Sequence, residues 1–181
     1  MHKTPYTPPL SAPRQQILET MRTLEIKQIP LLAEDGTIAG IVIHDILAGL
    51  RRPDRPNNVV IMAGGKGKRL MPITSDLPKP MVPVGGKPIL EWIISRCTHY
   101  GFANFTFAIN YLGHMIEDYF GDGSSFGCKI TYVKEKEFLG TAGALSLLDK
   151  NQLHPLVVMN GDILSSIDFA ELVDYHDAGH Y

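Results

Sequence analysis

From Val59 onward, short apolar strands alternate with amphipathic helices, and this alternation constrains the fold more than any other feature. Residues 59–63 form a fully apolar run that glycines follow at once. The apolar periodicity predicts further strands at 105–109, 129–133 and 156–159, and helices at 88–100, 115–120, 141–148 and 168–178. Such an alternation predicts a mainly parallel sheet with helices on both faces. We therefore expect an α/β fold with a Rossmann-like sheet.

In an open parallel sheet, ligands bind beyond the carboxyl ends of the strands. The loops after Ala63, Ile109, Val133 and Met159 are therefore the expected place for a functional site.

The part of the chain before Val59 follows a different pattern. Residues 1–13 carry four prolines and predict a loose leader. Residues 14–52 predict a small segment of its own, with a helix at 14–24, a hairpin of strands at 29–32 and 38–43, and a helix beginning at 45–50. Charged and proline-rich residues 53–57 predict a linker, and residues 58–181 the main domain.

Composition excludes several classes of protein. A hydrophobic fraction of 44% argues against a mostly disordered chain, and a net charge of -2 argues against a nucleic-acid binder. No apolar run approaches the length of a membrane span, and the amino terminus lacks the apolar core of a signal peptide, so we expect a cytoplasmic protein. Cys97 and Cys128 lack metal-site spacing and predict free thiols.

The loop after the first apolar strand is the strongest functional signal. Glycines there let the backbone approach a ligand, and three cationic side chains suit a polyphosphate. Neither familiar phosphate loop matches, because Gly67-Lys68 is followed by Arg69 rather than Ser or Thr, and position 70 is leucine rather than a third glycine. The predicted nucleotide-binding residues of this loop are Ala63, Gly64, Gly65, Lys66 and Gly67.

The residues that follow point to one family. After Arg69 the chain continues through Pro72, Thr74 and the segment 79–84, Lys-Pro-Met-Val-Pro-Val. These residues resemble the sugar-nucleotide pyrophosphorylases, whose signature is a GGxGxRLxPxT loop followed by a KPMxPV-type segment. Further agreement with this family lies in Gly85-Gly-Lys-Pro-Ile-Leu, Asn110-Tyr-Leu, Gly121-Asp-Gly, Leu139-Gly-Thr-Ala-Gly-Ala-Leu and Asn160-Gly-Asp162. The Leu139-Gly-Thr-Ala-Gly segment resembles mannose-1-phosphate guanylyltransferases and related enzymes.

The resemblance implies a sugar-1-phosphate nucleotidyltransferase that converts a nucleoside triphosphate and a sugar-1-phosphate into a nucleotide sugar and pyrophosphate. Arg69 matches the family arginine that holds the leaving pyrophosphate, and Lys79 the lysine that contacts phosphate at the reaction centre. Asp162 matches the aspartate that binds Mg²⁺. These three residues are the predicted catalytic set, with Asp162 as the metal ligand.

Base choice rests on fewer residues. Glu135 lies where relatives place a side chain against the base, and an ionised carboxylate accepts the two adjacent donors of guanine, which favours GTP. The alternative is that Glu135, within Lys-Glu-Lys-Glu, belongs to a solvated charged face. Gly140 and Thr141 are further predicted nucleotide-binding residues.

Residues 14–50 resemble the latter part of a CBS motif, a small module that works in pairs. Fusions of CBS motifs with nucleotidyltransferases activate sugars for surface glycans. With the first strand and the partner motif missing, we expect packing or homo-oligomer formation rather than nucleotide binding. Ile43 replaces the usual Thr or Ser, and Asp45 comes one residue early.

Two functional hypotheses stay open from the sequence. Relatives continue beyond the position of Tyr181 and there supply a sugar pocket and a second metal-binding aspartate, so we expect the domain to be truncated at the carboxyl end. The chain is then either the nucleotide-binding half of an active nucleotidyltransferase, or a non-catalytic nucleotide-binding or oligomerisation module or inactive fragment of the enzyme.

Overall fold

The structure is a computed structural model that describes residues 6–48, 52–135, 137, 139–140, 142–165 and 167–179. The chain divides into two compact units. The first comprises residues 1–52 with 83–87, and the second comprises residues 53–82 with 88–181.

The first unit is built on an antiparallel hairpin. Strands β1 (Gln28–Leu32) and β2 (Ile38–Ile43) pair, with helix α1 (Arg14–Thr23) before them and α2 (His44–Ala48) after them. Ile17, Met21 and Ile29 form its buried core. The predicted helix and hairpin are confirmed to within a residue. The CBS assignment stays a prediction. Two short strands, β4 (Pro83–Val84) and β5 (Lys87–Pro88), form a separate pair.

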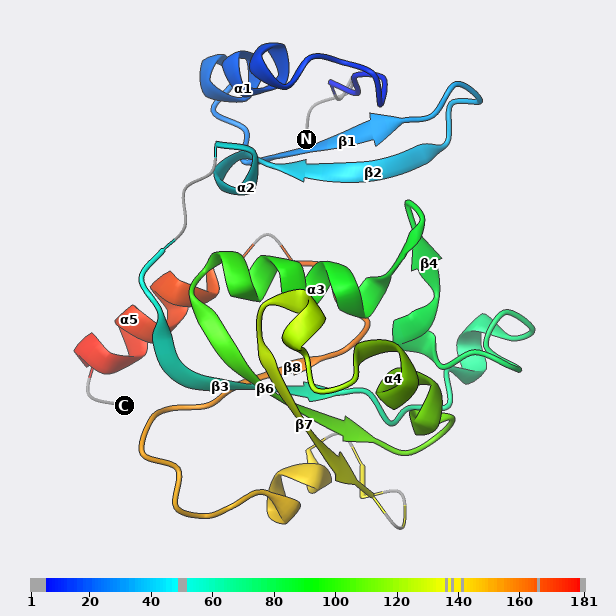
Figure 1. The fold of residues 1–181 in the computed structure, drawn as a ribbon, viewed down its shortest axis with the longest axis vertical. Coiled ribbons are helices and arrows are strands. Elements are labelled where there is room, and N and C mark those ends of the chain that lie inside the picture. The colour runs from blue at the N-terminus through cyan, green and yellow to red at the C-terminus, as the bar shows by residue number, and fades with distance from the viewer. Residues whose placement is uncertain are drawn as a thin grey trace. The chain divides into compact units, whose positions relative to one another are not determined.

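The second unit contains a four-stranded parallel sheet (Figure 1). Its strands are β3 (Arg55–Met62), β6 (Phe102–Ile109), β7 (Lys129–Lys134) and β8 (Val157–Asn160), in the order β7-β6-β3-β8. Its α-helices are α3 (Ile89–His99), α4 (Gly113–Phe120) and α5 (Phe169–Gly179). This arrangement confirms the predicted α/β fold with a parallel sheet flanked by helices.

One face of this sheet forms the main core. Alternate residues of β3 and β6, including Val59, Ile61, Phe105 and Phe107, are buried with apolar residues of α3, α4 and α5. On the opposite face lies the segment that contains the 3₁₀ helix η4 (Gly143–Leu147), drawn in yellow below the sheet (Figure 1). Three further 3₁₀ helices are η1 (Lys68–Leu70), η2 (Lys79–Met81) and η3 (Ser124–Phe126).

Three local predictions need correction. The α-helix predicted over 141–148 is the short 3₁₀ helix η4, because Gly140 adopts φ +85° and Gly143 is a second poor helix former. Residues 55–57, predicted as part of a linker, lie in β3, where long-range contacts hold them. Gly179, predicted to stop the last helix, is its final residue.

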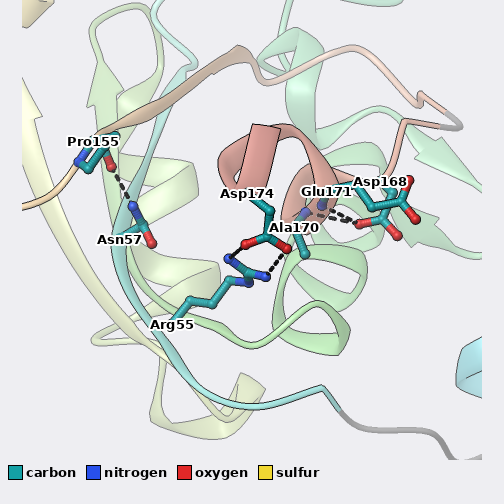
Figure 2. A network of polar contacts seen from close by, with 7 residues as sticks. All are labelled: Arg55, Asn57, Pro155, Asp168, Ala170, Glu171 and Asp174. Carbon is teal, nitrogen blue, oxygen red and sulfur yellow. Dashed lines mark hydrogen bonds and ion pairs between the residues drawn. The ribbon is translucent and has the colours of Figure 1, made fainter. Parts of the chain in front are cut away.

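The long-range contacts at the start of β3 are shown in Figure 2. Arg55 donates two hydrogen bonds of 2.8 Å to the carboxylate of Asp174 in α5. Asn57 is buried and donates from Nδ2 to the carbonyl of Pro155 at 2.9 Å. Asp168 accepts bonds from the backbone N–H groups of Ala170 and Glu171, which confirms it as the predicted N-cap of α5.

Of these two contacts, we expect the buried one to contribute more to stability. Replacing Asn57 with alanine removes a donor from a buried bond, which should lower the free energy of unfolding by about 1–2 kcal/mol. Replacing Arg55 with alanine breaks a partly exposed ion pair and should cost less than about 1 kcal/mol. Urea unfolding of both variants compares the two losses, and equal losses would contradict this ranking.

Both cysteines are free thiols, as predicted. Burial raises the pKa of Cys97 to about 12 and that of Cys128 to about 11, so neither thiol is activated as a nucleophile. Among the described residues, no helix is both long and apolar enough to span a bilayer.

Candidate functional site

The strand order places a binding crevice at the end of β3. Its neighbour on one side is β6 and on the other β8, so the connections diverge there, and ligands of open α/β sheets bind at such points. A cavity of about 600 Å³ lies there. Its lining comprises Met62, Ala63, Gly64, Gly65, Lys66, Gly67, Lys68, Arg69, Leu70, Lys79, Pro80, Ala108, Glu135, Gly140, Asn160 and Asp162.

This cavity brings together every predicted site residue that the structure describes. The predicted loop from Ala63 to Gly67, with Arg69, meets Lys79, Glu135, Gly140 and Asp162 there. Thr141 lies outside the described residues. Segments far apart in the sequence thus converge, as expected when several strands end at one edge of a sheet.

Two positions of the glycine loop require glycine: at Gly64 the backbone lies close to neighbouring side chains, and at Gly67 the chain turns sharply. A Cβ on Gly64 would lie 2.9 Å from Glu135 Oε2 and 3.1 Å from Asn110 Cβ, so a larger residue would displace the floor of the cavity. Gly67 has φ +61°, a left-handed conformation that favours glycine. From this turn η1 begins, and it carries Lys68 and Arg69 to the cavity. The loop is therefore shaped by glycine and charged by lysine and arginine, as a polyphosphate site requires.

An ion pair lies in the lining of the same cavity. The ammonium of Lys79, in η2, contacts Oδ2 of Asp162, which follows β8. The two side chains are 29% and 24% exposed, so a ligand can reach both although each is partly desolvated. Between β8 and Asp162, position 161 has little room for a side chain. A Cβ on Gly161 would lie 3.2 Å from Ile61 Cγ2 and 3.3 Å from Pro80 Cγ. Because the Lys79 ammonium already pairs with the Asp162 carboxylate, a bound phosphate would compete with that carboxylate for the ammonium.

The carboxylates present suit one kind of metal site. Over the described part of the chain, no group of three or more His, Cys, Asp and Glu side chains could enclose a metal ion. Mg²⁺, however, is commonly held by one or two carboxylates together with substrate phosphates and water. Asp162 therefore fits an Mg²⁺ ion that arrives with a phosphorylated substrate.

Glu135 closes another side of the cavity. Its backbone N–H donates to the carbonyl of Ile109 at 3.1 Å, and its carbonyl accepts from Asn110 Nδ2 at 3.1 Å. Its Oε1 atom is buried and has no hydrogen-bond partner among the residues that the structure describes, and burial raises the pKa of this carboxyl. A buried acceptor without a donor is costly, so a ligand that supplies donors would relieve this side chain.

Some lining residues were not among the predicted site residues. Lys68 was noted only as one of the three cationic side chains of the loop, and Asn160 lies inside the recognised Asn160-Gly-Asp162 motif, so position within the motif could have identified both. Met62, Pro80 and Ala108 carry no chemical signal, and their place in the lining follows from strand register and packing.

Known proteins resemble this chain both in sequence and in structure. The chain is 40% identical over 120 residues to the mannose-1-phosphate guanylyltransferase of Mycobacterium tuberculosis, covering 66% of this chain and 33% of that protein. It is 42% identical over 115 residues to the N-acetylmuramate α-1-phosphate uridylyltransferase of Neisseria meningitidis, covering 61% and 48%. Among solved structures, HddC from Yersinia pseudotuberculosis complexed with GMP-PN aligns with a TM-score of 0.59 and 30% identity, covering 66% of this chain and 54% of that one.

The chain spans between a third and a half of the length of these two curated relatives. Residues 58–180 also match the sequence profile of the family described as nucleotidyl transferase. The glycine loop, the Lys79–Asp162 pair and all of the parallel sheet except residues 55–57 lie within that match, and the chain therefore belongs to the nucleotidyl transferase family.

Proposed function

We propose that this chain binds a nucleoside triphosphate and transfers its nucleotidyl group to a sugar-1-phosphate, with GTP as the donor and surface-glycan precursors as the products. The observation that carries this proposal is the cavity of about 600 Å³ in which a cationic glycine loop meets the Lys79–Asp162 pair. The relatives named for guanylyl or uridylyl transfer to sugar phosphates support the reaction class.

The reaction joins two anions, so the main task of the site is to neutralise charge and align the reactants. An oxygen of the sugar phosphate attacks the α-phosphorus of the triphosphate, and the bond from that phosphorus to the β-phosphate bridging oxygen breaks. Pyrophosphate leaves with the electron pair. Arg69 can hold it, because a guanidinium binds two phosphate oxygens at once.

Lys79 and Asp162 act at the α-phosphate in this proposal. The lysine would leave its carboxylate partner and contact a phosphate oxygen, and Asp162 would then be the residue that holds a divalent ion. A bound Mg²⁺ lowers the repulsion between the two phosphates. The ion pair keeps both side chains aligned on the cavity before substrate arrives.

Glu135 supports guanine as the base. Guanine N1–H and N2–H are adjacent donors, and rotation of this carboxyl toward the cavity would exchange a buried unpaired oxygen for two hydrogen bonds. We expect Glu135→Gln to reduce the preference for GTP over UTP about tenfold, a typical change for one hydrogen bond to a charged group. Equilibrium binding of both nucleotides measures it.

Glu137→Gln is the matched control, because Glu137 is exposed and loses the same charge. An equal shift in both variants would assign the effect to general electrostatics and remove the argument for guanine.

The proposed function is tested on the purified 181-residue chain. It is incubated with each of the common ribonucleoside triphosphates, Mg²⁺ and a panel of sugar-1-phosphates that includes mannose-1-phosphate, while pyrophosphate release is measured. We expect release with GTP and one of the sugars. Heat of GTP binding without pyrophosphate release would refute catalysis by this chain, and no binding of any triphosphate by the folded protein would refute the nucleotide site itself.

A further inference from the structure

Thr74 is fully buried although it does not line the cavity. Its hydroxyl donates a hydrogen bond of 2.8 Å to the carbonyl of Gly67, seven residues earlier in the chain. The segment between them lines the cavity with Lys68, Arg69 and Leu70 and then turns away from it, and this bond ties the far end of the segment back to Gly67.

The carbonyl of Gly67 accepts two hydrogen bonds. Besides the Thr74 hydroxyl, the backbone N–H of Leu70 donates to it at 2.9 Å, and this second bond closes the turn of η1. The peptide that follows Gly67 is therefore held from both sides. Lys68 and Arg69 lie between Gly67 and its Leu70 donor, within the turn that this carbonyl closes.

The contact between Gly67 and Thr74 leaves no free space. A Cβ on Gly67 would lie 2.9 Å from Thr74 Cγ2, closer than real Cβ atoms approach, and a tight 3.1 Å from Thr74 Cβ. The threonine methyl thus packs against the glycine while its hydroxyl holds the carbonyl. A second bond supports the same segment, since the Tyr111 hydroxyl donates to the carbonyl of Ser75 at 2.7 Å.

We propose that Thr74 is a positioning residue for triphosphate binding. Its hydroxyl fixes the carbonyl of Gly67, and this fixes the η1 turn that presents Arg69 to the cavity. This inference rests on the proposed nucleotide site and adds to it a residue that touches no substrate. Without the hydroxyl, the Gly67 carbonyl keeps its Leu70 donor, so the loss should appear as greater freedom of the turn rather than as unfolding.

The test compares Thr74→Val with Thr74→Ser. Valine keeps the shape and removes the hydroxyl, whereas serine keeps the hydroxyl and removes the methyl. Amide hydrogen exchange at Leu70 reports the turn directly, and calorimetry with GTP and with GMP reports the phosphate contacts. In Thr74→Val we expect faster exchange at Leu70 and about tenfold weaker GTP binding, as the loss of one hydrogen bond produces. GMP, which lacks the β- and γ-phosphates, should lose less than about twofold, and Thr74→Ser should restore GTP binding.

Thr98→Val is the matched control, since its hydroxyl bonds to the carbonyl of Ser95 within α3. Thr98→Val should change neither the hydrogen exchange at Leu70 nor the affinity for GTP. Unaltered exchange and GTP affinity in Thr74→Val, with a wild type that binds GTP, would overturn the role of Thr74 alone. Equal losses for GTP and GMP would also overturn it, because they would indicate a general loss of structure. A wild type that binds no triphosphate would refute the proposed function and this role with it.

Discussion

Replacing Asp162 with asparagine is expected to weaken the binding of Mn²⁺ to the protein–GTP complex about a hundredfold, which corresponds to about 2.7 kcal/mol. Loss of groups that merely orient metal ligands costs 10–100-fold in affinity, and removal of the ligating charge itself should reach at least the upper end. Asparagine retains the size of the side chain and one oxygen, so the change isolates the charge. Electron paramagnetic resonance of free and bound Mn²⁺ measures the affinity.

The matched control for this change is Asp118→Asn. Asp118 is an exposed carboxylate in α4 and does not line the cavity, so the same loss of charge there should leave Mn²⁺ affinity unchanged. If both variants weaken Mn²⁺ binding alike, the effect is one of net charge and the metal assignment fails.

The ion pair of Asp162 gives the experiment a second arm. The Lys79 ammonium contacts the carboxylate that we assign to the metal, so lysine and metal compete for it when no nucleotide is bound. Lys79→Met should therefore strengthen Mn²⁺ binding to the free protein while it weakens GTP binding. Weaker Mn²⁺ binding in the free Lys79→Met protein would contradict this competition.

Most of the candidate site could be predicted from the sequence because its residues lie in short motifs next to strand ends. The glycine loop directly follows the apolar run that becomes β3, and Asp162 follows the run that becomes β8. Because parallel strands bring such loops to one edge of the sheet, local sequence patterns were enough to predict which residues meet in the cavity. Glu135 was predicted from its position and from the hydrogen-bonding chemistry of a carboxylate, and the burial of its Oε1 without a partner among the described residues appeared only with the structure.

Features that depend on distant partners could not be predicted in this way. Asn57 reads as a polar residue beside prolines, yet it is buried because the carbonyl of Pro155 accepts its hydrogen bond. Thr74 was noted in the sequence only as part of the family signature, and its proposed positioning role depends on its hydrogen bond to Gly67 and on how closely the two residues pack. The 3₁₀ helix at Gly143–Leu147 was mistaken for an α-helix because apolar spacing outweighed two glycines. In each case tertiary contacts or backbone conformation decided the outcome, and the residue pattern reports neither.

The largest expected loss of stability comes from replacing Phe107 with alanine. Phe107 is fully buried in β6, and its ring meets Phe120 and Tyr132 edge to face with centroids 5.7 and 5.8 Å apart. A Phe→Ala change in a packed core costs about 3–5 kcal/mol, because it removes apolar contact and leaves a cavity. Since a domain of this size is stable by only about 5–15 kcal/mol, the variant should unfold at much lower urea concentration.

Phe107→Leu separates the lost volume from the lost aromatic contacts. Leucine fills much of the space, so we expect a loss of about 1–2 kcal/mol, part of it from the edge-to-face pairs. Tyr175→Ala is the control, because that ring is 70% exposed and its removal should change stability by less than about 0.5 kcal/mol. Urea midpoints measured at constant slope give all three values. Similar losses for Phe107→Ala and Tyr175→Ala would mean that the face of the sheet toward α3, α4 and α5 does not form the stabilising core, and the placement of the cavity at the end of that sheet would lose its support.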